Sequence, residues 1–413
     1  MTLFISLRTI HSYSYSHALF SPASNPRCQK VRRFQGKILG IIMICFCAAV
    51  AQTQTFTTLI NFDGTNGNAV PIRAMVQGMD GNFYGSTEGN LGSSYGSIFK
   101  MTPDGVLTTL HRFGDYTYVS GPLVQVADGS FYGASIIGGA SDDGQVFEIT
   151  SEGVFTTIYS FSANGFGSTK PYSGLLQASD GNLYGTTNGG DNYGTIYRVT
   201  PEGSVRTVAV FHRYDGEAPN ALIQATDGNL YGTAAIGGVN EDGTVFKLTP
   251  SGVLTTLHNF NLTDGGDPNA GLVQASDGNF YGTTRSGGSH NQGTVFKITP
   301  TGSLTTLHNF NVSDGSEPEA ALIQASDGNL YGTTTLGGDV NAGTVFKITP
   351  AGVLTTLHSF AYTDGRLPEC ALVQGADGDF YGSTAFGGTH SQGTIFRLSM
   401  GLGALSKNKT DLH

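Results

Sequence analysis

The sequence is short of charge, of cysteine and of long apolar runs. Charged residues make up 13% of its 413 positions, and beyond residue 51 there are no clusters of Lys and Arg, so we expect no nucleic-acid partner. Three of the four cysteines lie at positions 28, 45 and 47. Cys370 therefore stands alone in the rest of the chain, which excludes an internal disulfide there and predicts a fold held by burial and strand pairing.

The first 51 residues contain no acidic residue and six basic ones. Residues 31–37 are basic, residues 38–50 are apolar, and Ala49-Val50-Ala51 has the small-x-small form that precedes signal-peptidase cleavage. The apolar run is shorter than the roughly 20 residues of a membrane-spanning helix. We therefore interpret residues 1–51 as a leader whose true start lies near residue 31, and expect no integral membrane segment in the mature chain.

Removal of this leader makes the chain strongly acidic. It takes away six of the 21 basic residues and none of the 31 acidic ones, so 15 basic residues face 31 acidic ones and the net charge is −16. Sequence motifs for a nucleophile elbow, a phosphate-binding loop, paired metal cysteines or a zinc-binding helix are absent. This favours a non-enzymatic role and leaves the question of activity open.

What the sequence does contain is glycine, 60 residues in all, and an internal repeat. Seven copies of the dipeptide Tyr-Gly are spaced at intervals near 50 residues, with their tyrosines at Tyr84, Tyr132, Tyr184, Tyr231, Tyr281, Tyr331 and Tyr381. Repeats of about 40 to 50 residues with several strand-like runs are typical of the blades of a β-propeller. The sequence therefore predicts an all-β protein with seven blades over residues 52–400, followed by a short polar tail at 401–413.

One repeat shows four strands. Residues 321–325, 330–334, 344–349 and 353–360 are rich in apolar, β-branched and aromatic residues, and Asp-Gly, Gly-Gly and Pro-x-Gly sequences separate them. We call these antiparallel strands A to D from the centre outward. A single such sheet cannot bury both apolar faces, whereas a ring of seven sheets can.

The two chain ends carry the strands that the ring needs for closure. Residues 56–62 match a D strand that has no A strand before it, and residues 393–398 match a C strand that has no D strand after it. We predict that these segments pair, so that the N-terminal strand completes the last blade.

The run Leu-Ile-Gln-Ala-Ser-Asp-Gly-Asn-Leu-Tyr-Gly-Thr-Thr at 322–334, followed by Gly-Gly and then by Gly-Thr-Val-Phe-Lys-Ile-Thr-Pro at 343–350, resembles the tandem GloVer repeat of exported bacterial proteins. The resemblance covers about residues 55–400. It implies a secreted or surface propeller of unassigned activity. Some relatives carry a C-terminal sorting signal, but the tail of this chain has no apolar anchor. A broader likeness to gluconolactonase-like propellers concerns the fold and implies no activity.

Residues repeated in every copy are best explained by the blade itself. The aspartates of the A–B turns are predicted to form turns, and the glutamines of the A strands are predicted to bond neighbouring backbone. His111, His258, His308 and His358 occupy a position that holds Ile, Tyr or Ala in other copies, so packing is the expected role.

Variation between copies lies in the B–C and D–A loops, which an up-and-down sheet places on one face. The candidate binding residues combine B–C loop positions with the starts of A strands near the channel mouth. They are Arg73, Asp191, Asn240, Glu241, Asp242, Arg285, His290, Glu319, Asp339, Glu369 and His390. A solvated acidic rim without a ligand is the alternative.

Three functions fit this sequence. The first is an exported binding or scaffold module, in the periplasm, on the cell surface or secreted, that recognises a protein or carbohydrate ligand through the variable face. The second is a hydrolase or lyase in which Glu319 and Glu369 hold Ca²⁺ at the channel mouth, since calcium takes six to eight oxygen ligands. The third is a structural surface protein. No cofactor other than calcium is expected.

Overall fold

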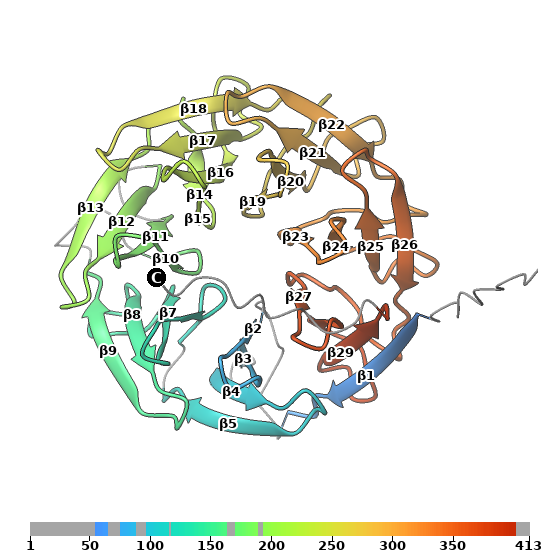
Figure 1. The fold of residues 1–413 in the computed structure, drawn as a ribbon, viewed down its shortest axis with the longest axis horizontal. Coiled ribbons are helices and arrows are strands. Elements are labelled where there is room, and N and C mark those ends of the chain that lie inside the picture. Colours follow the sequence, from blue (N-terminus) through green and yellow to red (C-terminus); the bar gives the residue numbers. More distant parts are fainter. Residues whose placement is uncertain are drawn as a thin grey trace, which may run out of the picture. The chain divides into compact units, whose positions relative to one another are not determined.

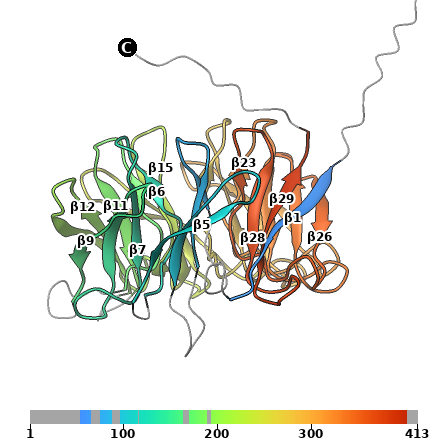
Figure 2. The ribbon, with the colours of Figure 1, turned by 90° about the horizontal axis from the view of Figure 1, so that it is seen from below.

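The computed structural model describes residues 54–64, 75–87, 96–114, 117–162, 170–188 and 193–401. Every regular element within these ranges is a β-strand, and no helix among them is long and apolar enough to cross a membrane. The strands form seven antiparallel sheets that stand around a central axis like blades (Figure 1). The side view in Figure 2 shows the strands running between two faces that carry the loops.

The strands of the first three blades follow one another along the chain. Blade 1 holds β2 (Val76–Gln77), β3 (Phe83–Thr87), β4 (Ser97–Met101) and β5 (Leu107–Arg112). Blade 2 holds β6 (Val124–Gln125), β7 (Phe131–Ser135), β8 (Gln145–Ile149) and β9 (Phe155–Ser160). Blade 3 holds β10 (Leu176–Gln177), β11 (Leu183–Thr187), β12 (Thr195–Val199) and β13 (Val205–Val210).

The next three blades repeat this order, with one extra strand in blade 4. Blade 4 holds β14 (Glu217–Pro219), β15 (Ile223–Gln224), β16 (Leu230–Ile236), β17 (Thr244–Leu248) and β18 (Leu254–Asn259). Blade 5 holds β19 (Val273–Gln274), β20 (Phe280–Thr284), β21 (Thr294–Ile298) and β22 (Leu304–Asn309). Blade 6 holds β23 (Ile323–Gln324), β24 (Leu330–Thr334), β25 (Thr344–Ile348) and β26 (Leu354–Ser359).

Blade 7 combines the two ends of the described chain. It holds β27 (Val373–Gln374), β28 (Phe380–Thr384) and β29 (Thr394–Ser399), and its outer strand is β1 (Thr55–Asn61). Strands β1 and β29 are antiparallel, with Thr55 opposite Ser399 and Asn61 opposite Thr394. The predicted closure of the ring by the N-terminal strand is confirmed.

The blades are held together by burial of the B and C strands on both faces. In blade 5 all five residues of β20 are buried, as are four of the five in β21. Apolar clusters span neighbouring blades, for example Tyr231 of blade 4 with Phe280 and Phe296 of blade 5. The repeated Tyr-Gly is explained here, because a Cβ on Gly282 would lie 2.6 Å from the Phe296 ring.

Repeated glutamines link neighbouring blades at six junctions, as predicted. The side chain of Gln274 donates to Gly278 O at 3.2 Å within its own turn and accepts the backbone N–H of Thr226, in the preceding blade, at 2.9 Å. The same bond closes the ring, since Ala376 N donates to Gln77 Oε1 at 2.8 Å. Each such link satisfies backbone groups that strand A does not pair.

The repeated aspartates hold the A–B turns, also as predicted. Asp277 accepts Asn279 N through Oδ1 and the Tyr281 hydroxyl through Oδ2, at 3.0 and 2.8 Å. Burial acts to raise the pKa of Asp277, but these hydrogen bonds and that from the Asn279 side chain outweigh it, so the pKa lies below its ordinary value. The carboxylate is therefore a charged structural element of the turn.

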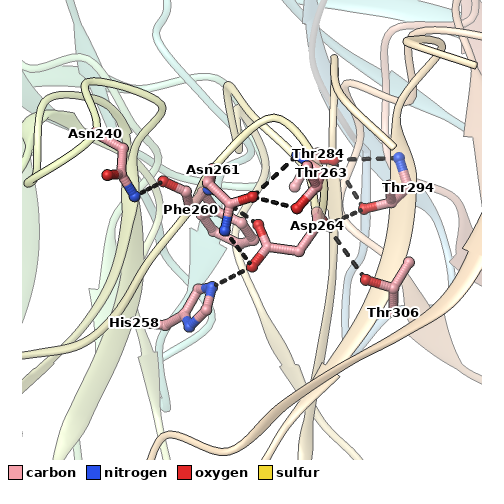
Figure 3. A network of polar contacts seen from close by, with 9 residues as sticks. All are labelled: Asn240, His258, Phe260, Asn261, Thr263, Asp264, Thr284, Thr294 and Thr306. Carbon is pink, nitrogen blue, oxygen red and sulfur yellow. Dashed lines mark hydrogen bonds and ion pairs between the residues drawn. The ribbon is translucent and has the colours of Figure 1, made fainter. Parts of the chain in front are cut away.

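On the opposite face the D–A loops are fixed by a second aspartate (Figure 3). Asp264 accepts Asn261 N at 3.0 Å and lies 3.1 Å from His258 Nε2, while its carbonyl accepts Thr294 Oγ1 of blade 5 at 3.3 Å. His308 and His358 make the same contact with Asp314 and Asp364. These histidines are therefore bonded within the frame as well as packed in it.

The innermost strands are shorter than predicted. The sequence suggested five residues for strand A of blade 6, whereas β23 has two. Strand A pairs with strand B on one side only, and the chain before it bends along the channel mouth instead of continuing the ladder. Isolated bridges such as Ser316 to Leu336 bring the D–A loop beside the end of strand B. The variable loops thus share one face, as predicted.

Candidate functional site

A cavity of about 330 Å³ opens where the chain enters the A strands around the axis. Blades 2 to 7 all contribute to its wall, through residues three to seven positions before the repeated glutamine. The lining residues include Tyr118, Ser120, Tyr172, Ser173, Asn220, Asn269, Glu319 and Glu369. The corresponding residues of blade 1 lie outside the described ranges. The cavity is built on the repeat, but each blade presents a different side chain to it.

Blades 5, 6 and 7 form a charged wall. Arg285 follows β20 directly, and its Nε lies 2.7 Å from Glu319 Oε1, which precedes strand A of the next blade. The same guanidinium lies 3.0 Å from Glu317 Oε2 and 3.4 Å from Asp267 Oδ2. One cation therefore serves three carboxylates, and Glu369 adds a fourth acidic group.

Burial, together with this excess of negative charge, raises the pKa values of Glu319 and Asp267. Burial is the largest influence on Glu319 and raises its pKa to about 7; Arg285 opposes this, while the charges of Glu369, Glu317 and Asp267 reinforce it. Burial likewise raises the pKa of Asp267, again against the effect of Arg285. Near neutral pH Glu319 therefore exchanges its proton, so that it can donate a hydrogen bond or carry charge.

Blades 2 and 3 form an aromatic and hydroxylic wall. Tyr172 is 37% exposed, and Tyr118 lines the same cavity. The buried hydroxyls have structural partners, since Ser120 Oγ donates to Ala134 O at 3.0 Å and Ser173 Oγ lies 2.8 Å from Thr186 Oγ1. The tyrosines are the side chains of this wall that a ligand can stack on.

Three of the predicted candidates meet at this mouth. Glu319 and Glu369 line the cavity, and Arg285 contacts Glu319. Arg73 and Asp191 lie outside the described residues. The structure places the remaining six in the B–C loops, where none lines the cavity; these are Asn240, Glu241, Asp242, His290, Asp339 and His390.

The loop-tip candidates contact the frame around them. Asn240 Nδ2 donates to Phe260 O at 2.9 Å, Glu241 lies 2.6 Å from Arg213, and Asp339 N donates to Ser359 Oγ at 2.8 Å. Tyr118 and Tyr172 were missed by the sequence analysis. Their signal was the sequence before the glutamine, which reads Tyr-x-Ser-Gly-Pro in blade 2 and Tyr-Ser-Gly in blade 3. Blades 4 to 7 have Asn or Glu after a proline at this place.

Metal-ligating geometry is a separate question. Across the described ranges, no group of three or more His, Cys, Asp or Glu side chains is arranged to hold a metal ion. At the mouth, the guanidinium of Arg285 lies against Glu319, where a cation would otherwise stand.

The ring of seven sheets, six with four strands and one with five, is closed by the N-terminal strand and hollowed at the axis, which defines a seven-bladed β-propeller. The WD40 β-propeller domain of Doa1 is similar, with a TM-score of 0.55 and 14% sequence identity over 84% of this chain and 97% of that one. An extracellular domain assigned to a one-component system of B. thetaiotaomicron has a TM-score of 0.52 and 12% identity. That match covers 84% of this chain and 40% of that one, so the chain spans less than half of its length.

Residues 46–225 and 218–410 match the family described as the Gloeobacter/Verrucomicrobia repeat. The chain belongs to this family, which confirms the resemblance noted in the sequence. No curated protein matches the chain. At these identities the similarity to solved structures concerns the fold.

Proposed function

We propose that this protein is an exported binding module that recognises a protein or glycan ligand through its variable loop face, with the channel mouth as the principal site. One observation carries the proposal. A frame repeated seven times surrounds a cavity whose lining differs from blade to blade, with carboxylates on one side and tyrosines on the other. Pockets that combine aromatic surface with a few polar groups are typical of ligand sites.

The proposal is tested by binding screens on the mature protein. A glycan array and a pull-down from the native host should yield a ligand whose affinity falls at least about tenfold in Tyr172→Ala and in the Glu319→Gln, Glu369→Gln double variant. Glu241→Gln, at a loop tip away from the cavity, is the matched control and should bind as the parent does. Equal binding by all variants would remove the mouth from the proposal, and empty screens would favour a structural role.

A calcium-dependent hydrolase or lyase is the second candidate, because Glu319 and Glu369 lie close enough for the charge of one to raise the pKa of the other. Calcium would have to displace Arg285 from Glu319 and recruit further oxygens. The measurement is the melting temperature with and without CaCl₂. A rise that is lost in the Glu319→Ala, Glu369→Ala double variant supports this candidate, and an unchanged melting temperature ends it.

Export is proposed from the leader pattern of residues 1–51. Cleavage after Ala51 would release a chain that begins just before β1, the strand that closes the ring. N-terminal sequencing of the protein recovered from the periplasm or the medium tests this, and a product that retains residues 31–51 would contradict it.

A further inference from the structure

Four of the seven junctions between blades share an aromatic pair, and three have a leucine in place of its phenylalanine. At four junctions a phenylalanine at the start of strand B stacks on the tyrosine of the preceding blade. The ring centroids lie 4.0 to 4.3 Å apart in the pairs Tyr84–Phe131, Tyr231–Phe280, Tyr331–Phe380 and Tyr381–Phe83. Each phenylalanine in these pairs is fully buried, so the ring fills the space between the two sheets.

At the junctions of blade 2 with 3 and of blade 3 with 4, leucine replaces that phenylalanine, at Leu183 and Leu230. The facing residue of strand D, a leucine at the other junctions, is β-branched there, Ile158 and Val208. Isoleucine differs from leucine in shape and stiffness, and valine is also one methylene smaller. Clefts of about 270 and 220 Å³ open at these two places, lined in part by these residues.

The tyrosines beside the two clefts are more exposed because the phenylalanine ring is absent. Tyr132 and Tyr184, which line the two clefts, are partly exposed, whereas Tyr331 beside a phenylalanine is fully buried. A leucine also stands at the junction of blades 5 and 6, but Leu307 is retained on strand D there and Tyr281 stays fully buried. Both clefts therefore combine a leucine on strand B with a β-branched residue on strand D.

The cleft between blades 2 and 3 differs from the other junctions in charge as well. In the six other blades, the fourth residue of the Thr-Val-Phe-Lys-Ile-Thr run, or of its equivalent, is Lys or Arg. In blade 1 this residue is Lys100, whose Nζ lies 2.8 Å from the turn carboxylate of Asp80. Blade 2 has Glu148 instead. Asp128 and Tyr132 line the cleft, and Glu148 lies opposite Tyr132 on the neighbouring strand. Burial raises the pKa of Tyr132, and the charges of Glu148 and Asp128 raise it further.

The junction of blades 2 and 3 thus lacks both the phenylalanine ring found at four other junctions and the Lys or Arg found in the six other blades. We propose that the cleft between blades 2 and 3 binds a ligand that carries an aromatic ring next to a cationic amine. The ring takes the place against Tyr132 and Leu183 that phenylalanine holds elsewhere, and the amine takes the place of the absent lysine beside Asp128 and Glu148. This site lies on the face of the A–B turns and is independent of the channel mouth.

The neighbouring cleft provides the comparison. Blade 3 keeps a cation, Arg198, whose charge acts on Asp180 in the wall of that cleft. It therefore has room for a ring but no excess of carboxylate, and should not favour an amine.

The test uses β-phenylethylamine as the probe, with binding to the mature protein followed by NMR chemical-shift perturbation. Phenylacetate has the ring without the amine, and n-butylamine has the amine without the ring; both should bind at least about tenfold more weakly, since each omits one of two contacts. Leu183→Phe restores the internal ring and should abolish binding, whereas Leu230→Phe fills the other cleft and should leave binding unchanged.

Glu148→Lys provides a second variant that does not change the apolar packing. It should weaken β-phenylethylamine at least about tenfold and remove the preference over phenylacetate. The proposal is overturned by any of three results: no binding at millimolar concentration, equal affinity for phenylacetate, or full binding by a folded Leu183→Phe protein. If Leu183→Phe does not fold, undiminished binding by Glu148→Lys has the same force.

Discussion

Replacement of Glu319 by glutamine should change how the stability of the ring depends on pH. The carboxyl has a pKa of about 7 in the folded protein against 4.5 in an unperturbed chain. The folded state therefore holds a proton that the unfolded state releases, so the unfolding free energy falls as pH rises between these two values. Stability contributed by the protonated form is complete below about pH 4.5 and lost above about pH 7.

The size of the effect follows from the shift. A difference of about 2.5 pKa units corresponds to about 3 kcal/mol at 1.36 kcal/mol per unit. Glu319→Gln keeps the shape and hydrogen-bonding capacity of the protonated acid but cannot ionise. The unfolding free energy of the variant should equal that of the parent near pH 4 and exceed it by about 1 to 3 kcal/mol near pH 8. The lower figure applies if loss of the ion pair between Arg285 and Glu319 offsets part of the gain.

The measurement is urea unfolding across this pH range. The chain has no tryptophan, so far-UV circular dichroism is the suitable signal. Glu241→Gln is the control, because Glu241 lies in an exposed pair with Arg213, and its curve should run parallel to that of the parent. If Glu319→Gln also runs parallel to the parent from pH 4 to pH 8, burial and unbalanced charge do not act on Glu319 as argued.

Three further perturbations address the frame. Gln77→Ala should lower the unfolding free energy by about 1 to 2 kcal/mol, because Ala376 N–H loses its acceptor across the closing junction; Gln274→Ala at an internal junction should cost a similar amount, and no loss in either would discount the glutamine links. Asp277→Asn should flatten the acid unfolding curve below about pH 3.8, since the lowered pKa of Asp277 makes stability fall as pH drops through that range; superimposable curves would argue against a charged turn. Removal of residues 54–62 should expose the edge of β29 and produce oligomers in size-exclusion chromatography, whereas a monomer of unchanged melting temperature would show that closure contributes little.

Most of the frame could be read from the sequence because the repeats are in register. The predicted strand at 330–334 matches β24, and the unpaired runs at the two ends predicted the pairing of β1 with β29. Strand A was overestimated, because its apolar residues face the neighbouring blade whether or not its backbone continues the ladder. An apolar pattern reports burial and does not report where hydrogen bonding stops.

The site could be predicted only in part. Glu319 and Glu369 stood out as acidic residues at the start of A strands, and their place at the mouth followed from the topology. The contact of Arg285 with Glu319 joins two blades and could not be derived from either repeat alone. The clefts were equally hidden, since the loss of one ring at Leu183 becomes visible only when Ile158 is seen to face it.

The position of β1 has a consequence for biosynthesis. The strand at residues 55–61 is the first of the ring to leave the ribosome, yet its partner at 394–399 is among the last. Until residues 394–399 have been synthesised, β1 lacks the strand with which it pairs, and blade 7 is incomplete. Closure of the ring therefore requires synthesis of the polypeptide through β29. We expect a prematurely terminated chain to remain an open ring that is susceptible to proteolysis.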